Sequence, residues 1–252
     1  MQHITFAKPT FEYLSIDMHV HSKHSHDSKV QVQDILNRAK ELNIGIAITD
    51  HNAIEGSLEA GKQNEVLVIP GIEVTTSEFK DILIYFENFN ELKDFYNSHV
   101  KPFIKLKKRT SYTKIKMIDL LKSLKEYKCI ISIAHPFIVV PKRSFYFVQQ
   151  HKYFSYIDAI EVMTRAQTKK SDLACYGFAL NNNKMITAGS DAHTLKQIGK
   201  IVSTFNGKST LKNIFSAIRN KKNSVIGKDK YFRETIKSKI KNIKSSILEK
   251  DN

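Results

Sequence analysis

Residues 15–28 read SIDMHVHSKHSHDS, and this stretch decides the fold. Its first part, 15–20, is a short apolar run that is typical of a buried strand. The run ends in the pattern His19-Val20-His21. Residues i and i+2 of a strand point to the same side, so two imidazoles there can bind one metal ion. The stretch therefore predicts a strand that carries metal ligands at its carboxyl end.

Further apolar runs rich in isoleucine and valine recur along the chain. Six of them are predicted strands, at 44–49, 66–69, 82–86, 129–134, 157–162 and 185–188. Segments with apolar residues at helical spacing are predicted helices, at 30–43, 114–127, 169–181 and 210–220. This alternation predicts an α/β architecture with a parallel sheet. Seven strands favour a (β/α)7 barrel, similar to a TIM barrel, over an open sheet.

Histidines and carboxylates follow five of these strands. They are His19 and His21 after the first, His51 after the second, Glu73 after the third, His135 after the fifth, and Asp191 and His193 after the seventh. The carboxyl ends of the strands of an α/β barrel form one face, which is where the active site lies. We therefore expect these side chains to converge. Asp27, in the loop after the first strand, is a further predicted ligand, and His26 is its alternative.

The ligand types indicate the metal and the chemistry. Cys129 and Cys175 form no Cys-x-x-Cys pair, so the ligands are nitrogen and oxygen atoms, which suit zinc, manganese or iron. Eight ligands are too many for one ion, and two or three ions with Glu73 as a bridge are expected. Clustered divalent ions supply an activated hydroxide and clamp the oxygens of an in-line displacement. This chemistry fits the hydrolysis of phosphate esters best.

Together these residues resemble the PHP family, named for polymerase and histidinol phosphatase. The matching stretches are DMHVHSKHSHDS (17–28), IAITDHNAIEGS (46–57), IPGIEVTT (69–76), IAHPF (133–137), AIEVM (159–163) and TAGSDAH (187–193). The resemblance implies a distorted seven-stranded barrel with a centre of two or three metal ions at the strand ends. It also implies phosphoester hydrolysis.

The resemblance assigns the ligands to three ions. The first would be held by His19, His21, Glu73 and Asp191, the second by Glu73 and His135, and the third by Asp27, His51 and His193. Asp191 and His193 are the candidate catalytic residues. The family usually places a further histidine after the third strand, and here Asp81 stands in its place, as a candidate ligand of the second ion.

Other polar residues are assigned supporting roles. Arg165, after the sixth strand, and Arg143, in the loop after His135, are candidate substrate-binding residues, because the arginine fork suits phosphate oxygens. Asp17 and Asp50 are expected to orient the ligands.

The net charge of +15 is concentrated in two segments. Residues 101–128 carry ten Lys/Arg and two Asp/Glu, and residues 208–252 carry thirteen and four. Such fields attract polyanions. We expect a phosphoesterase domain at 1–228 with a helical insertion near 88–128, and a basic helical extension at 229–252. We find no signal peptide or membrane span and expect a cytoplasmic protein.

The predicted function is a metal-dependent phosphoesterase that acts on a small phosphomonoester or a nucleotide. The basic segments support an alternative, a nuclease or phosphatase that acts on nucleic-acid ends. A second alternative is a non-catalytic PHP module that binds metal and docks on a partner. The oligomeric state stays open.

Overall fold

The computed structural model describes residues 2–10, 13–107, 110–138 and 153–227. The strands are β1 (Ile4–Phe6), β2 (Leu14–Val20), β3 (Gly45–Ile48), β4 (Gly71–Thr75), β5 (Asp81–Phe86), β6 (Ile104–Lys107), β7 (Thr110–Thr113), β8 (Cys129–Ile133), β9 (Ala159–Met163), β10 (Met185–Ala188), β11 (Ile201–Phe205) and β12 (Ser224–Gly227). The α-helices are α1 (Val32–Leu42), α2 (Glu55–Ala60), α3 (Phe89–Phe95), α4 (Met117–Ser123), α5 (Lys169–Asn181) and α6 (Leu211–Arg219). Short helical turns are η1 (Tyr96–Val100), η2 (Lys101–Phe103), η3 (Leu124–Glu126), η4 (Phe154–Tyr156) and η5 (Leu195–Gln197).

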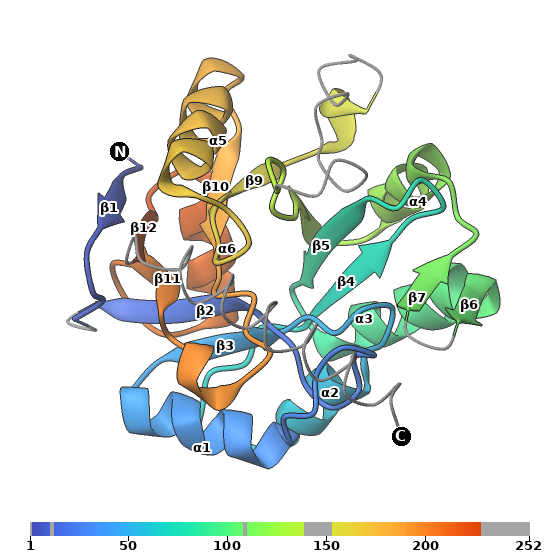
Figure 1. The fold of residues 1–252 in the computed structure, drawn as a ribbon, viewed down its shortest axis with the longest axis horizontal. Helices are drawn as coiled ribbons and strands as arrows, with labels where there is room; N and C mark the ends of the chain where they lie inside the picture. The colour runs from blue at the N-terminus through green and yellow to red at the C-terminus, as the bar shows by residue number, and fades with distance from the viewer. Residues whose placement is uncertain (1, 11–12, 108–109, 139–152, 228–252) are drawn as a thin grey trace, which may run out of the picture.

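Two five-stranded sheets form the centre of the molecule (Figure 1). Their strand orders are β1-β12-β11-β2-β3 and β10-β9-β8-β5-β4. Isolated bridges join the two sheets, Val20 to Ala192 on one side and Ile46 to Val68 and His51 to Glu73 on the other. The α/β class is confirmed. The predicted distorted barrel is not seen as a closed barrel among the described residues, where isolated bridges link the two sheets.

The strand directions also differ from the predicted parallel sheet. β5 runs antiparallel to both β4 and β8, and β11 runs antiparallel to β2 and β12. The third predicted strand, 66–69, contributes only the bridge at Val68, and the strand itself is β4. Ile69 and Pro70, which belong to no helix or strand, separate the two. Because β5 is antiparallel, its amino end lies at the same edge as the carboxyl end of β4.

The helices follow the apolar periodicity that predicted them. In α1, the residues Val32, Ile35, Leu36 and Ala39 are buried on one face. The helix ends at Asn43, which adopts the left-handed conformation with φ 53° and donates its N–H to the carbonyl of Lys40. Asparagine tolerates this conformation well, so Asn43 can end the helix.

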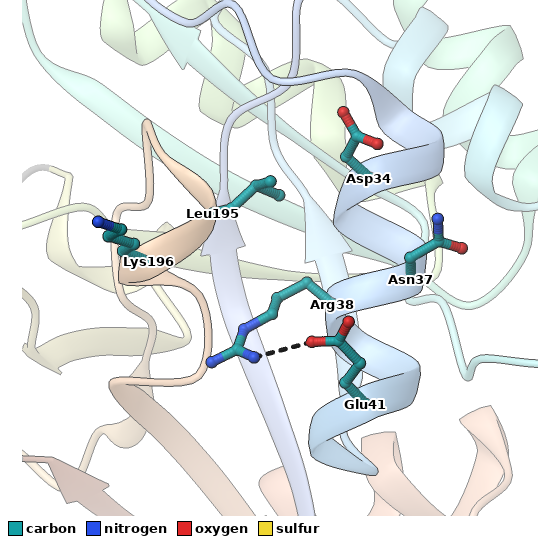
Figure 2. Close-up of a pocket in the computed structure, with 6 residues that line it drawn as sticks. All are labelled: Asp34, Asn37, Arg38, Glu41, Leu195 and Lys196. Atoms are coloured by element: carbon teal, nitrogen blue, oxygen red, sulfur yellow. Dashed lines mark hydrogen bonds and ion pairs between the residues drawn. The ribbon is translucent and has the colours of Figure 1, made fainter.

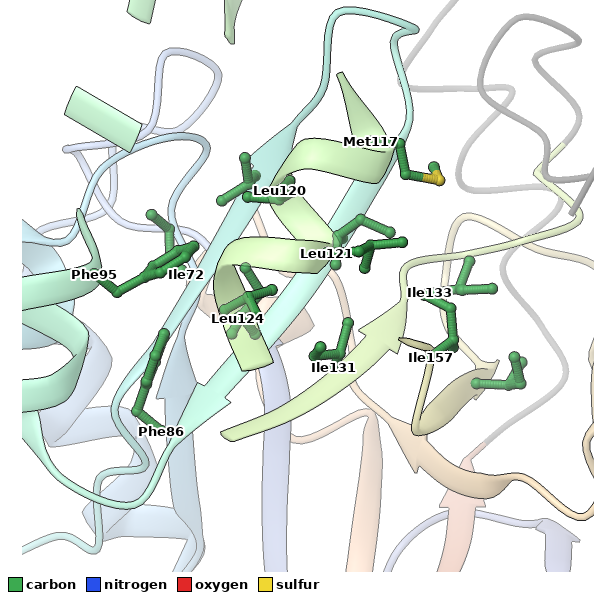
Figure 3. Packing of buried hydrophobic residues seen from close by; sticks show 14 of the residues in the cluster. Ile72, Phe86, Phe95, Met117, Leu120, Leu121, Leu124, Ile131, Ile133 and Ile157 are labelled. Atoms are coloured by element: carbon green, nitrogen blue, oxygen red, sulfur yellow. The ribbon is translucent and has the colours of Figure 1, made fainter. Parts of the chain in front are cut away.

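The segment between β5 and β8 is only partly helical. It holds α3, η1, η2, the antiparallel hairpin β6–β7, α4 and η3. The predicted helical insertion is therefore wrong where the hairpin lies. Figure 3 shows the side chains of α4 packed over β5 and β8, where Leu120, Leu121 and Leu124 join Phe86 and Ile131 in one buried cluster. The segment is thus part of the core.

Two further predictions can be placed against the described residues. The basic helix expected at 229–252 lies outside them. Among the helices that are described, none has the length and apolar character needed to cross a membrane.

Candidate metal centre

The predicted ligands of the first strand lie at the carboxyl end of β2. His19 is in the strand, His21 follows its last residue, and their buried Nε2 atoms lie 3.0 Å apart. Asp191 Oδ1 approaches the same place, 3.6 Å from His19 Nε2 and 3.1 Å from His21 Nε2. The bridge between Val20 and Ala192 brings Asp191 there. Three predicted ligands therefore meet, although 170 residues separate His21 from Asp191 in the chain.

Glu73 lies at the centre of the cluster, fully buried within β4. Its Oε2 atom lies 3.3 Å from His19 Nε2 and 3.4 Å from His21 Nε2. The same oxygen lies 3.2 Å from His51 Nδ1. Its Oε1 atom lies 3.3 Å from His135 Nε2. One carboxylate thus approaches four histidines, which is the position that a bridging ligand requires.

The loop after β2 supplies a carboxylate at the outer side of the cluster. Asp27 Oδ2 lies 3.0 Å from His193 Nε2 and 3.5 Å from His51 Nε2. His193 Nδ1 lies 3.7 Å from Asp191 Oδ1. The alternative ligand, His26, is exposed, and its ring centroid lies 5.0 Å from that of His51. The geometry favours Asp27, because its carboxylate reaches the ring nitrogens of two histidines.

Asp81 stands where the resemblance led us to expect a histidine. It is the first residue of β5 and is fully buried. Its Oδ2 atom lies 3.9 Å from His135 Nε2. Asp81, His135 and Glu73 form one group of donor atoms that could hold a metal ion. The antiparallel direction of β5 is what carries an aspartate at an amino end to this place.

The donor atoms fit divalent cations. Four groups of three donors occur among the described residues: His19, His21 and Asp191; His21, His51 and Glu73; His21, Asp27 and His193; and Glu73, Asp81 and His135. The donor atoms of each group lie within 4.8 Å of one another. Ligand atoms bound tetrahedrally to an ion at about 2.1 Å lie about 3.4 Å from one another. The distances between histidine nitrogens and the oxygens of Glu73 are close to this value. Imidazole and carboxylate donors suit zinc, manganese and iron.

The cluster pairs opposite charges in a buried place. Burial alone would lower the pKa of His51, but the neighbouring carboxylates, Glu73 above all, raise it to about 10. Burial and the repulsion of His193 lower the pKa of His21 to about 4. Burial would raise the pKa of Glu73, yet His51 and His19 hold it well below its usual range. A proton on His51 would balance part of the carboxylate charge here, and a bound cation would take over that role.

Two buried aspartates hold the backbone beside the ligands. Asp17 accepts hydrogen bonds from the N–H and the hydroxyl of Ser190, at 2.8 and 2.6 Å. Asp50 accepts from the N–H and the hydroxyl of Ser22, at 2.6 and 2.7 Å. Burial raises the pKa of each carboxyl to about 6 in spite of these bonds. Each serine adjoins a predicted ligand in the sequence, so the two aspartates are positioned as the expected orienting role requires.

Glu161 is a site residue that the sequence analysis did not single out. It is fully buried in β9, where its Oε1 lies 2.9 Å from His19 Nδ1. Its Oε2 accepts the N–H of His135 at 2.8 Å. Glu161 therefore orients one ligand through its ring and another through its backbone. The signal for it was an acid inside the apolar stretch AIEVM (159–163).

Replacing Glu161 with glutamine should weaken metal binding by roughly 10- to 100-fold, as losses of such supporting contacts do. The amide would remove the charge that orients the His19 ring. Competition with a chromophoric chelator measures the affinity. Glu59→Gln is the matched control, because Glu59 pairs with His24 at the surface, at 3.1 Å. Equal affinities in the two variants would contradict the orienting role of Glu161.

Two site residues have a strained backbone. His135 has a φ of 29° and Asp191 has a φ of 51°. Side chains other than glycine rarely adopt such positive φ values, and these conformations cluster at functional sites. The surrounding bonds hold both residues in place. One of these is the bond from the His135 N–H to Glu161.

Of the two predicted phosphate-binding arginines, the structure describes only Arg165. Arg165 lies two residues beyond β9 and is half-buried. Arg143 lies outside the described residues. A separate surface pocket of about 450 Å³ lies between α1 and η5 (Figure 2). Its Arg38 is paired with Glu41 at 2.9 Å, so its charge is already balanced.

The fold and the site define a class of mixed α/β proteins with clustered histidines and carboxylates whose donor atoms could hold divalent metal ions. The family model of the PHP domain matches residues 17–177, and that of the PHP-associated region matches residues 176–223. The chain belongs to the PHP family. A comparison with curated proteins finds no match.

Several solved structures share the fold. PsfC from Pseudomonas syringae is 18% identical, with a TM-score of 0.65 over 90% of this chain and 96% of that one. A two-domain protein from Bacteroides vulgatus that contains a predicted PHP-like metal-dependent phosphoesterase is 16% identical, with a TM-score of 0.65 over 90% and 69%. A lesion-specific endonuclease from Pyrococcus furiosus is 18% identical, with a TM-score of 0.67 over 84% and 57%. At these identities the likeness is one of fold.

Proposed function

We propose that this protein is a metal-dependent phosphoesterase that acts on a small phosphomonoester or a nucleotide. The observation that carries the proposal is the position of Glu73, whose two oxygens serve two different groups of donor atoms. A shared carboxylate holds two cations close together, which suits the displacement at a phosphate. Membership of the PHP family supports the same chemistry.

The ligands divide between an inner and an outer part of the site. Bound divalent ions would activate a water near neutral pH and neutralise charge on the phosphate. His19 and Glu73 are fully buried, whereas the side chains of Asp191 and His193 are 17% and 29% exposed. Asp27, whose side chain is 32% exposed, lies on the same outer side, so these three are the donors that an approaching ester meets first. Of these, we assign Asp191 and His193 to contact the reacting phosphate, in addition to their place in the donor groups.

Substrate recognition is assigned to basic residues at the mouth of the site. Arg165 follows β9, the strand that carries Glu161, so it belongs to the same edge of the sheet as the ligands. Its guanidinium can bind two phosphate oxygens at once. Arg143 keeps the same proposed role from its position in the sequence.

Metal dependence tests the proposal directly. The purified protein, supplied with Mn²⁺ or Zn²⁺, is expected to release phosphate from a panel of phosphomonoesters and nucleotides. Removing the metal with a chelator should abolish the release, and adding the metal back should restore it. His19→Ala should lower turnover on the order of 10³-fold, about 4 kcal/mol in the barrier, because it removes a central ligand.

The contrary outcome is equally clear. Turnover that survives both chelation and His19→Ala would show that the metal mechanism is wrong. A protein that binds metal ions but releases phosphate from none of these esters would instead favour the non-catalytic module. His24→Ala is the matched control, because His24 belongs to none of the donor groups of the described residues and pairs with Glu59 at the surface.

A specific observation also favours a nuclease as the second candidate. The basic segment 101–128 contains the hairpin β6–β7, and Asn52 Nδ2 donates to Ser111 Oγ of that hairpin at 3.1 Å. Asn52 directly follows His51, so the basic segment adjoins the metal centre. The lysines of this segment would bind the backbone of a nucleic acid that approaches the site.

The two candidates differ in their dependence on salt. A nuclease should bind labelled oligonucleotides with an affinity that falls steeply as salt rises, and it should produce defined cleavage products. Release of phosphate from small esters without salt-sensitive binding would leave the phosphomonoesterase as the function.

A further inference from the structure

Asp81 is held in one orientation by its partner across the sheet. Thr75 and Asp81 are paired residues of the antiparallel strands β4 and β5. The Thr75 hydroxyl donates to Asp81 Oδ1 at 2.6 Å. The other oxygen, Oδ2, is the one that approaches His135. The hydroxyl thus holds Oδ1, and Oδ2 is left as the oxygen that faces His135 and the metal site.

This donor group differs in chemistry from the others. Three of the four groups contain two imidazoles and one carboxylate. The group of Glu73, Asp81 and His135 contains one imidazole and two carboxylates. Carboxylate oxygen suits harder cations such as manganese, whereas imidazole suits zinc. The second carboxylate also adds negative charge in a buried place, where no water screens it.

We propose that Asp81 lowers the preference for zinc over manganese in the donor group of Glu73, Asp81 and His135. The centre would then hold two kinds of ion. Thr75 is the positioning residue that keeps Asp81 in this role. The proposal rests on the metal centre of the proposed function. It adds that one donor group has a different metal preference, and it names Asp81 as the residue responsible. Its key readout is metal binding, which does not depend on activity.

The experiment compares the zinc and manganese affinities of the whole chain. Mn²⁺ is loaded first, free Mn²⁺ is followed by electron paramagnetic resonance, and Zn²⁺ is then titrated in while both bound metals are counted by elemental analysis. The wild-type chain should retain one manganese that zinc displaces poorly. In Asp81→His, the zinc concentration needed to displace that manganese should fall by roughly tenfold. This is the low end of the effects on metal affinity that substitutions around a metal site cause.

Companion variants keep the test decisive. Asp81→Asn keeps the size of the side chain but removes its charge, and it should lose this manganese while zinc still binds elsewhere. Thr75→Val should shift the zinc preference in the same direction as Asp81→His, and Thr75→Ser should restore the wild-type preference because it keeps the hydroxyl. Asp119→His, at an exposed position of α4, controls for zinc bound by an added surface histidine.

The outcomes separate this inference from the function beneath it. If the wild type and both Asp81 variants bind metal with the same preference for zinc, the inference is wrong and the metal centre stands. If Thr75→Val and Thr75→Ser behave alike, the role of Thr75 is wrong. If the wild-type chain binds no metal under any loading condition, the proposed function itself fails.

Discussion

Replacing Glu73 with glutamine is expected to remove at least one equivalent of bound metal and to lower phosphoesterase turnover on the order of 10³-fold, about 4 kcal/mol. The physical reason is that Glu73 serves two donor groups, with Oε2 near His51 and Oε1 near His135. An amide keeps the shape of the side chain but offers one oxygen and no charge. The metal-free protein should also lose about 3 kcal/mol of its free energy of unfolding, because buried histidines lose their counter-charge.

Elemental analysis, turnover and chemical denaturation measure these three effects. Glu65→Gln is the matched control, because Glu65 pairs with Lys40 at the surface, at 2.8 Å, and should show none of them. A Glu73→Gln protein that keeps its full complement of metal would refute the bridging position. A loss of stability without loss of metal would assign Glu73 a structural role only.

The sequence predicted the repetitive parts of the fold well. The helix expected at 169–181 is α5 with the same bounds, and the strand expected at 15–20 is β2 with one further residue. Both predictions depend only on the residues of the element itself. The closure of the barrel depends on which distant strands pair and in which direction, and the pattern of one segment does not name its partner. The strands β11 and β12 were not predicted.

The candidate site shows the opposite pattern. Glu73 is a charged residue inside a strand, and the rules that find strands weigh against such residues. The third strand was therefore predicted at 66–69, before Glu73. Glu161 lay inside the strand predicted at 157–162 but was given no role in the site. Functional sites are where local rules are broken and the surrounding structure compensates. The histidines were found because histidines or carboxylates followed five of the predicted strands.

The sequence predicted Asp81 as a ligand but not how the fold brings it to the cluster. Its place in the chain identified it as the substitute for a histidine. Its access to the cluster depends on the antiparallel direction of β5, which the predicted parallel sheet did not contain. The structure brings Asp81 to the cluster by a route that the sequence did not indicate.

Gly189→Ala is expected to disrupt the metal centre from outside the set of ligands. Gly189 follows β10 and packs directly on β2. A Cβ atom at this position would lie 2.3 Å from the backbone nitrogen of His19 and 2.4 Å from its Cβ. Real Cβ atoms do not approach backbone so closely, so β2 or the chain at Gly189 must move apart. His19 carries contacts to Glu73 and Asp191, and the displacement should break both.

Overpacking of this kind costs about 1–3 kcal/mol or more of the free energy of unfolding, and metal affinity should fall with it. Thermal unfolding with and without Zn²⁺ measures both effects, because a protein that still binds metal is stabilised by it. Gly177→Ala is the matched control: Gly177 lies in α5 with open space around its Cβ position, so alanine there should stabilise the helix by about 1 kcal/mol. If Gly189→Ala unfolds at the wild-type temperature and keeps its zinc-dependent shift, β2 and β10 do not pack as described, and the alignment of His19 with Asp191 must arise in another way.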